Sequence, residues 1–329
     1  MSVRVILMII LSWPINVNCQ SNMTKLSALS TKERGLFLAY SVGDNETFYI
    51  CGGKVELIYP KRDIVKELNL KTISEIGHRA YSSLSFDGQY IAYVRRISAS
   101  NNDEAITIFS LRDNSTKDLI RSPKPIYGLA WSPGAKQIAF LARNPYEENY
   151  RFSLYTVTLS SQQITDLTPN AYLDANSSIS WSPDGREIAV QQSYSSPIKG
   201  QSQGVVLVDC ETKQNRRVDF GRDPSWSPDG QRIAYLDISG ENCYTIRRDG
   251  ASKVKLFSGA RVISFGRELA GPLVWSPDMR FLVFHEMAGL IGDQRRIYVL
   301  NLRTGKKSEV FSGGRLELVD WRDCAVLSR

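Results

Sequence analysis

His78 and His285 are the only two imidazoles in this chain of 329 residues, so a site that needs three histidine ligands is excluded. One nucleophile pattern is present, because residues 200–204 (GQSQG) match G-x-S-x-G. In hydrolases this pattern presents a serine on a sharp turn from a strand to a helix. Here it lies in a loop rich in Ser, Gly and Gln between two predicted strands. We therefore predict a loop, and no nucleophile at Ser202.

No other group of polar residues predicts a reactive centre. Two histidines and a carboxylate can in principle hold a metal, but an isolated histidine is more often an ordinary surface side chain. The chain contains no Cys-x-x-Cys pattern, no phosphate-binding glycine loop and no dinucleotide pattern. Asp-Gly pairs such as Asp184-Gly185 lack the D-x-D-x-D spacing of calcium loops and predict turns. We predict no catalytic residue, no metal and no cofactor.

The overall composition is that of an ordinary globular protein. Hydrophobic residues make up 42% and charged residues 23%, which excludes a disordered, collagen-like or coiled-coil chain. The 41 Lys and Arg residues exceed the 34 Asp and Glu residues, for a net charge of +7. This basic bias falls short of a dedicated nucleic-acid-binding protein, so we expect no nucleic-acid partner.

Residues 1–19 are predicted to be a signal peptide. Arg4 precedes an apolar run over residues 5–11, and a polar stretch then ends at Cys19. The run is too short to span a membrane, which takes about 20 residues. We expect a secreted or periplasmic protein with one domain over residues 20–329 and no membrane span. The alternative is a lipid anchor through Cys19.

An internal repeat dominates the rest of the chain. Trp181-Ser-Pro-Asp-Gly recurs at Trp226, and looser copies begin at Leu84, Trp131 and Trp275. Degenerate copies flank these at residues 40 and 321. The steps between anchors are 44 to 50 residues, with no helical pattern between them. This is the period of a four-stranded propeller blade.

Each repeat predicts one blade. An inner strand ends at the tryptophan, Ser-Pro-Asp-Gly makes a tight turn, and a second strand of the Ile-Ala-Tyr type follows. We expect the tryptophans to pack between neighbouring blades, because a single sheet cannot bury its own faces. The third strands are predicted at residues 55–59, 106–111, 154–159, 205–209, 244–247 and 297–302.

The two ends of the chain are predicted to share one blade, which removes exposed strand edges. Residues 316–321 and 324–328 offer two strands, and residues 24–27 resemble an outer strand. The sequence thus predicts an all-β fold, a β-propeller of four-stranded blades. Seven anchors predict seven blades, and six blades with a C-terminal hairpin appended are the alternative.

Four cysteines follow the predicted signal peptide, in or beside strands of neighbouring blades. Cys51 with Cys324 and Cys210 with Cys243 are the natural disulfide pairs in an oxidising compartment. Pairing requires Cα atoms within about 7 Å of each other. Buried free thiols are the alternative for both pairs.

Residues 222–235 (RDPSWSPDGQRIAY) resemble the repeat of the TolB-type, or WD-like, propellers. The resemblance covers about residues 24–329 and implies a β-propeller. Related repeats occur in periplasmic TolB, in oligogalacturonate lyases and in the propellers of prolyl-oligopeptidase-like enzymes. TolB itself carries an α/β domain before a six-bladed propeller, whereas these repeats begin close to the predicted cleavage point. A TolB role is therefore an analogy of fold.

We expect a monomeric, non-enzymatic propeller that binds a protein or an anionic polymer at one face, a TolB-like scaffold role. The alternative is an enzyme or a small-ligand or carbohydrate-binding propeller, such as a lyase, with its site at the channel mouth. Loops from fourth to first strands should open on this mouth, and they carry ten basic and five acidic residues. The excess of basic residues creates a positive electrostatic field, which attracts anionic partners. The predicted contact residues are Arg79, Tyr127, Arg222, Asp223, Arg267 and Arg315.

Overall fold

The structure is a computed structural model of the whole chain. It describes residues 35–41, 46–51, 54–59, 82–97, 103–110, 112–113, 115–122, 125–143, 152–169, 173–174, 177–193, 203–258, 273–288, 294–312 and 316–323. Within these ranges the chain forms twenty-four strands. No helix in the described part is long and apolar enough to cross a membrane.

Five consecutive blades, each of four antiparallel strands, follow one another along the chain. The first two of these blades consist of β4 (Ser82–Leu84), β5 (Tyr90–Arg96), β6 (Glu104–Ser110) and β7 (Thr116–Ser122), and of β8 (Ile126–Trp131), β9 (Gln137–Arg143), β10 (Phe152–Thr158) and β11 (Ile164–Asp166). The next two consist of β12 (Ser180–Trp181), β13 (Glu187–Ser193), β14 (Gln203–Asp209) and β15 (Asn215–Phe220), and of β16 (Arg222–Trp226), β17 (Arg232–Leu236), β18 (Cys243–Arg247) and β19 (Val254–Phe257). The fifth consists of β20 (Val274–Trp275), β21 (Phe281–Ala288), β22 (Gln294–Asn301) and β23 (Lys307–Ser312).

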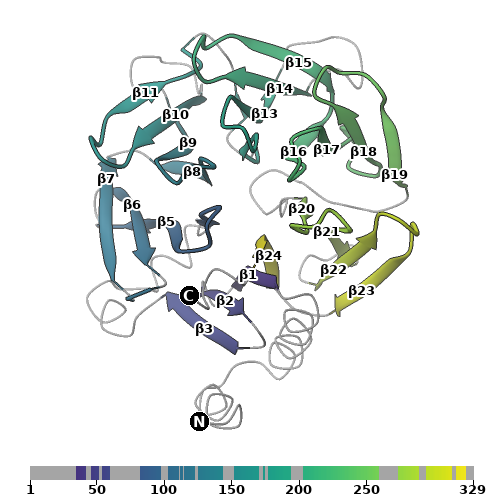
Figure 1. Cartoon of the computed structure of the whole chain (residues 1–329), viewed down its shortest axis with the longest axis horizontal. Helices are drawn as coiled ribbons and strands as arrows, with labels where there is room; N and C mark the ends of the chain where they lie inside the picture. Colours follow the sequence, from purple (N-terminus) through teal and green to yellow (C-terminus); the bar gives the residue numbers. More distant parts are fainter. Residues whose placement is uncertain are drawn as a thin grey trace.

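These blades surround a common centre. Figure 1 shows inner strands such as β8 and β16 near the centre, and fourth strands such as β15, β19 and β23 at the circumference. The predicted third strands of these five blades are confirmed, with ends that differ by three residues at most. The propeller prediction is therefore confirmed for this part of the chain.

A further four-stranded sheet joins the two ends of the described chain, in the order β24 (Leu316–Asp323), β1 (Gly35–Ser41), β2 (Glu46–Cys51) and β3 (Lys54–Tyr59). Strand β24 pairs antiparallel with β1, from Gly35 opposite Asp323 to Ser41 opposite Leu316.

This sheet differs from the prediction in its strand positions. Tyr40 lies in the second strand rather than in an inner one, and Lys54–Tyr59 is the fourth strand rather than the third. The degenerate copies at residues 40 and 321 thus share one sheet, because β24 takes the inner position. The predicted strands at residues 24–27 and 324–328 lie outside the described residues.

Each Ser-Pro-Asp-Gly copy forms a tight turn with its own hydrogen bonds. The Ser182 hydroxyl donates to Asp184 Oδ1 at 2.6 Å, and that oxygen accepts the Arg186 amide at 3.0 Å. Ser182 Oγ in turn accepts the Glu187 amide at 2.9 Å. The same bonds recur at Ser85, Ser227 and Ser276. The turn carboxylates are structural, as predicted.

The fourth residue of this turn adopts a left-handed backbone. Glycine fills the position in three copies, for example Gly185 at φ 72°. Ala135 and Met279 hold the same conformation at φ 51° and 58°. A left-handed conformation costs a residue with a side chain about 1–2 kcal/mol. The hydrogen bonds of the turn therefore impose the geometry even where glycine is absent.

The tryptophan anchors link each blade to the one before it. The indole Nε1 of Trp131 donates to the Ser83 carbonyl at 3.0 Å, and that of Trp181 to the Ala130 carbonyl at 3.1 Å. Trp275 repeats the bond to Ser225 at 3.2 Å. The Nε1 of Trp226 is buried and has no hydrogen-bond partner among the described residues. The predicted packing of these anchors between blades is confirmed.

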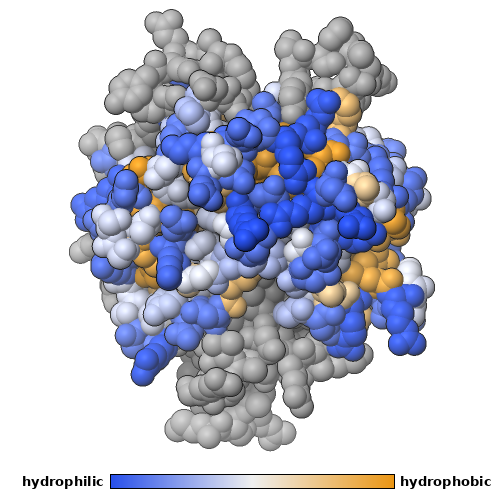
Figure 2. All heavy atoms as spheres, turned by 45° about the horizontal axis from the view of Figure 1, so that its top comes forward, coloured by the Kyte–Doolittle hydropathy of each residue, from blue (hydrophilic) through white to orange (hydrophobic). Residues whose placement is uncertain are grey.

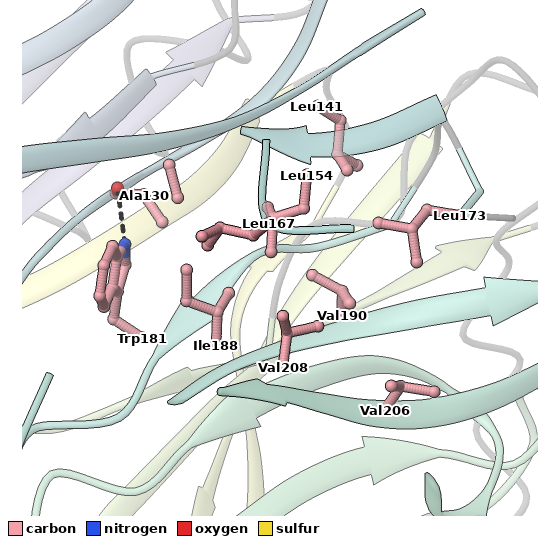
Figure 3. Packing of buried hydrophobic residues seen from close by; sticks show 11 residues of the cluster. Ala130, Leu141, Leu154, Leu167, Leu173, Trp181, Ile188, Val190, Val206 and Val208 are labelled. Carbon is pink, nitrogen blue, oxygen red and sulfur yellow. Dashed lines mark hydrogen bonds between the residues drawn. The ribbon is translucent and has the colours of Figure 1, made fainter. Parts of the chain in front are cut away.

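The hydrophobic core lies between the faces of neighbouring blades (Figure 3). In one cluster, Leu141 and Leu154 of the β8–β11 blade pack with Ile188 and Val206 of the β12–β15 blade, and Trp181 lies at the boundary. Each sheet therefore depends on its neighbour to bury its side chains.

Cys210 and Cys243 are free thiols, so of the two alternatives for this pair the free thiols hold and the disulfide does not form. Cys210 follows the end of β14, whereas Cys243 begins β18. Both are third strands that run in the same direction, so the two cysteines lie at opposite ends of their blades. Burial raises the pKa of Cys210 to about 12, with Asp209 and Glu187 adding to the effect. Cys324 lies outside the described residues.

Candidate functional site

Several polar and aromatic side chains gather at the end of the blades where fourth strands lead to the next first strand. We call this end the mouth end, and the following residues the mouth cluster: Tyr127, Phe152, Asp174, Gln191, Ser193, Gln203, Arg222 and Asp223. They come from the β8–β11 blade, the β12–β15 blade and the start of β16.

Asp174 lies at the centre of the mouth cluster. Its Oδ2 accepts hydrogen bonds from Gln191 Nε2 at 3.1 Å, Ser193 Oγ at 3.4 Å and Gln203 Nε2 at 3.4 Å. The preceding residue, Leu173, forms isolated bridges with both Phe152 and Gln192. This short segment thus joins two blades, and it fixes the carboxylate among amide and hydroxyl donors.

An aromatic pair packs beside Leu173, the residue that precedes Asp174. Tyr127 is the second residue of β8, the inner strand of its blade. Its ring packs edge to face on that of Phe152, with the centroids 5.0 Å apart. Both rings are partly buried and pack against the interblade cluster that contains Leu173. The pair therefore has little freedom to move, and Tyr127 keeps part of its surface open.

Arg222 and Asp223 form an irregular start to β16. The pairing with β17 is broken by a bulge between Arg222 and Ser225, and Asp223 has a left-handed φ of 55°. The Gly221 amide donates to the Gln203 carbonyl at 3.1 Å. A Cβ on Gly221 would lie 2.5 Å from the Leu236 carbonyl oxygen, so only glycine fits. Such a strained backbone is often found at functional sites.

Both predicted contact residues on this bulge are buried. Arg222 is 5% exposed and Asp223 is 1% exposed, so they belong to the wall of the mouth end rather than to an open surface. Tyr127 lies at the same end and is partly exposed. Arg79, Arg267 and Arg315 lie outside the described residues. The structure thus brings three of the six predicted residues to one end of the blades.

Five residues of the mouth cluster were not among the predicted contact residues: Phe152, Asp174, Gln191, Ser193 and Gln203. Asp174 occupies one of the predicted mouth loops, and Gln191 and Gln203 belong to a second and a third strand. Gln191 is 4% exposed, in a strand whose other residues from 187 to 190 are also buried. A glutamine in a run of buried residues was the available signal, because buried polar groups need partners.

The structure describes only some of the residues that were considered as reactive groups from the sequence. Ser193 and Gln203 pair antiparallel across a hairpin, which is not the strand-to-helix turn of a nucleophile elbow. Ser202 itself and His78 lie outside the described residues, and His285 lies on β21 opposite Ile297. In the ranges the structure describes, no three His, Cys, Asp or Glu residues are grouped to hold a metal.

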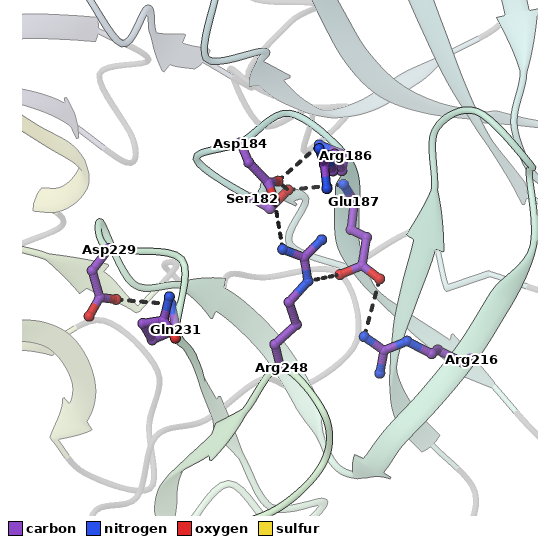
Figure 4. Close-up of polar contacts among 8 residues, drawn as sticks. All are labelled: Ser182, Asp184, Arg186, Glu187, Arg216, Asp229, Gln231 and Arg248. Carbon is purple, nitrogen blue, oxygen red and sulfur yellow. Dashed lines mark hydrogen bonds and ion pairs between the residues drawn. The ribbon is translucent and has the colours of Figure 1, made fainter.

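The opposite, turn end of the same blades carries an ion-pair cluster (Figure 4). Arg248, from the hairpin between β18 and β19, reaches Asp184 at 2.6 Å and Glu187 at 2.8 Å in the preceding blade. Arg216 of β15 reaches the other oxygen of Glu187 at 3.1 Å. Glu187 is buried, so its two arginine partners offset the cost of removing a carboxylate from water. This cluster joins two blades.

Acid should weaken this blade contact, and Arg248→Met should reduce that sensitivity. Burial raises the pKa of Asp184, but hydrogen bonds from Ser182 and Arg248 outweigh it and lower the pKa from 3.8 to about 2. A carboxyl with a lowered folded pKa contributes stability that is complete above the unfolded pKa of about 4 and is lost as pH falls to about 2. Without Arg248, the pKa of Asp184 moves back toward its ordinary value.

Melting temperatures measured from about pH 5 to about pH 2 test this expectation. The melting temperature of the wild type should fall further over this range than that of Arg248→Met. Arg303→Met, in the corresponding hairpin of the next blade, is the control. Its melting temperature should change with pH by the same slope as that of the wild type. Equal slopes for the wild type and Arg248→Met would show that the ion pair does not couple stability to pH.

The fold is shared with solved propeller structures. TolB from Acinetobacter baumannii superposes with a TM-score of 0.64 at 15% identity, over 89% of this chain and 67% of that chain. The putative TolB from Agrobacterium tumefaciens gives 0.55 at 14% identity, over 88% and 98% of the two chains. An oligogalacturonate lyase in complex with manganese gives 0.53 at 11% identity, over 85% and 74%.

The chain is therefore an all-β propeller that is structurally similar to TolB β-propeller domains, at low sequence identity. No protein-family model matches the sequence, and no curated protein sequence matches it. At these identities the likeness is one of fold, and the similar structures include both TolB and a lyase. Function has to be argued from the residues of this chain.

Proposed function

We propose that this propeller is a secreted or periplasmic, non-enzymatic scaffold that binds a protein or an anionic polymer at its mouth end. The observation that carries the proposal is the mouth cluster, in which Asp174 holds Gln191, Ser193 and Gln203 in place beside the Tyr127 ring. Polar groups that are fixed before a partner arrives lose little conformational entropy on binding.

The same geometry favours binding over catalysis. Three side-chain donors hydrogen-bond to Asp174 Oδ2, so this carboxylate is engaged in positioning the amide and hydroxyl groups around it. Arg222 and Asp223 are buried at the bulge that begins β16, at the same end of the blades. The cluster therefore presents a shaped polar surface with one aromatic contact.

A photo-crosslinking amino acid placed at Ser193 should capture the partner in an extract of the source organism. The same group at Gln231, which lies exposed in a turn at the opposite end, is the matched control. We expect discrete adducts from position 193 that Tyr127→Ala and Gln203→Ala weaken, and none from position 231. Equal adducts from both positions would contradict a mouth-end site. Cleavage of polygalacturonate by the purified protein would contradict the non-enzymatic proposal.

We also infer that the ring closes as six blades through the β24–β1–β2–β3 sheet. Strand β24 pairs with β1 along its length and lies against both β4 and β20, the inner strands of the neighbouring blades. A closed ring leaves no blade face without a neighbour. This closure gives the mouth end a fixed shape, on which partner binding would depend.

A further inference from the structure

The outer edge of three adjacent blades is strongly basic. We define the basic rim as residues 210–220, 247–257 and 301–309, which are the third-to-fourth-strand hairpins and fourth-strand residues of the β12–β15, β16–β19 and β20–β23 blades. It contains four acidic residues and ten basic ones, for a net charge of +6. The basic residues are Lys213, Arg216, Arg217, Arg247, Arg248, Lys253, Lys255, Arg303, Lys306 and Lys307.

This charge is concentrated on one side of the ring. The corresponding segments of the two preceding blades, residues 112–122 and 159–168, carry three basic and three acidic residues. In the rim, every basic residue except the half-buried Arg248 is exposed. Its three fourth strands follow one another along the circumference (Figure 1). The net charge of the basic rim is thus +6, against +7 for the whole chain.

Contacts between the blades make the rim continuous. Lys253 reaches Asp219 Oδ2 of the preceding blade at 2.7 Å, and Tyr235 donates its hydroxyl to the same oxygen. Between the next two blades, Phe257 stacks on Phe284 with ring centroids 4.2 Å apart. The three basic segments are thus held in a constant order around the edge.

Basic residues of the rim lie over an aromatic ring of the rim itself and over rings of the adjoining third strands. Arg217 lies over Phe220 at 4.1 Å, Lys253 over Tyr244 at 4.4 Å and Lys307 over Tyr298 at 3.8 Å. Proteins that bind single-stranded nucleic acid stack bases on open aromatic faces. Here the cationic heads take those places, so the rim would meet a partner through charge rather than through stacked bases.

The shape of the rim restricts the partner further. It lies on the convex circumference of the ring, which a stiff double helix could follow only by bending, at a cost in free energy. Hydrophilic side chains cover most of the described surface seen in Figure 2, with hydrophobic ones in small separate areas. Among the described residues, the large exposed hydrophobic side chains are scattered: Ile164, Val254 and Met279.

We propose that the basic rim binds a flexible, linear anionic polysaccharide that carries carboxylate or sulfate groups. Such a chain can follow the curved edge and meet the basic side chains of all three blades in turn. Its attraction is long-ranged at low salt and is screened as ionic strength rises. The rim is separate from the mouth cluster, so the polysaccharide and the mouth-end partner can be bound independently.

Binding of polygalacturonate and dextran sulfate by the purified protein tests the proposal, with neutral dextran as the blank. The rim variant is Lys213→Gln, Lys255→Gln and Lys306→Gln, with one exposed lysine changed in each blade. It should lower the affinity for at least one anionic polymer about tenfold at about 50 mM salt. The control variant removes the same charge from exposed residues outside the rim: Arg112→Gln, Lys117→Gln and Lys136→Gln.

The control variant should bind the polymers within about twofold of the wild type. Both triple variants should keep the wild-type melting temperature, because all six side chains are exposed. Equal weakening in the rim and control variants would overturn the proposal, because net charge alone would then explain binding. It would also be overturned if the wild type bound neither anionic polymer, or bound anionic lipid vesicles or single-stranded DNA more tightly than both.

Discussion

Trp131→Ala is expected to lower the free energy of unfolding by about 3–5 kcal/mol, a large share of the roughly 5–15 kcal/mol typical of a domain. Trp131 is 1% exposed and stacks with Tyr90 at 6.1 Å between centroids. It also donates to Ser83 across the blade boundary. The change therefore leaves a cavity between two blades and removes a hydrogen bond that joins them. Denaturant unfolding followed by fluorescence and circular dichroism measures the loss.

Two phenylalanine variants separate packing from the hydrogen bond. Trp131→Phe keeps most of the buried ring but removes the hydrogen bond from the indole to the Ser83 carbonyl, at a cost of about 0.5–1.5 kcal/mol. Trp226→Phe makes the same substitution where Nε1 has no partner among the described residues. It should cost less than Trp131→Phe. A larger loss at Trp226 would show that the interblade bond is not what makes the anchors important.

Removal of residues 316–329 should produce an aggregating or molten product. The deletion takes away β24, which exposes the edge of β1 and leaves β4 and β20 without the strand that lies between them. An unpaired edge is a template for association with other chains. Size-exclusion chromatography and thermal melting measure the outcome.

Deletion of residues 324–329 alone is the matched control, because it keeps every residue of β24. This shorter deletion should remain monomeric with a wild-type melting temperature. A protein lacking residues 316–329 that behaved in the same way would contradict closure of the ring through β24.

The repeating part of the fold could be predicted because its signals are local. A tryptophan, a Ser-Pro-Asp-Gly turn and a β-branched second strand lie within about ten residues of each other, and each has a direct physical reason. The strand positions of the shared sheet could not be predicted in the same way. Whether Tyr40 or Trp321 lies on an inner strand depends on pairing between chain ends nearly 300 residues apart.

The candidate site was harder to predict for a related reason. The sequence predicted Arg222 and Asp223 to be loop residues at the mouth, but they begin β16 at a bulge, and both are buried in the wall of the mouth end. Asp174 could not be recognised from its own loop, because its hydrogen-bond donors Gln191 and Gln203 lie 17 and 29 residues further along the chain. Free thiols at Cys210 and Cys243 likewise follow from strand direction rather than from blade adjacency.

The anchor bonds also have a direction. Trp131, Trp181 and Trp275 all donate to the blade that precedes them in the chain, and none of these three bonds requires a blade that comes later. A polypeptide that emerges from its N-terminus can therefore dock each new blade on a surface already formed. Among the described strands, the pairing of β24 with β1 joins segments nearly 300 residues apart, so we expect this sheet to form after the five blades that lie between them in the chain.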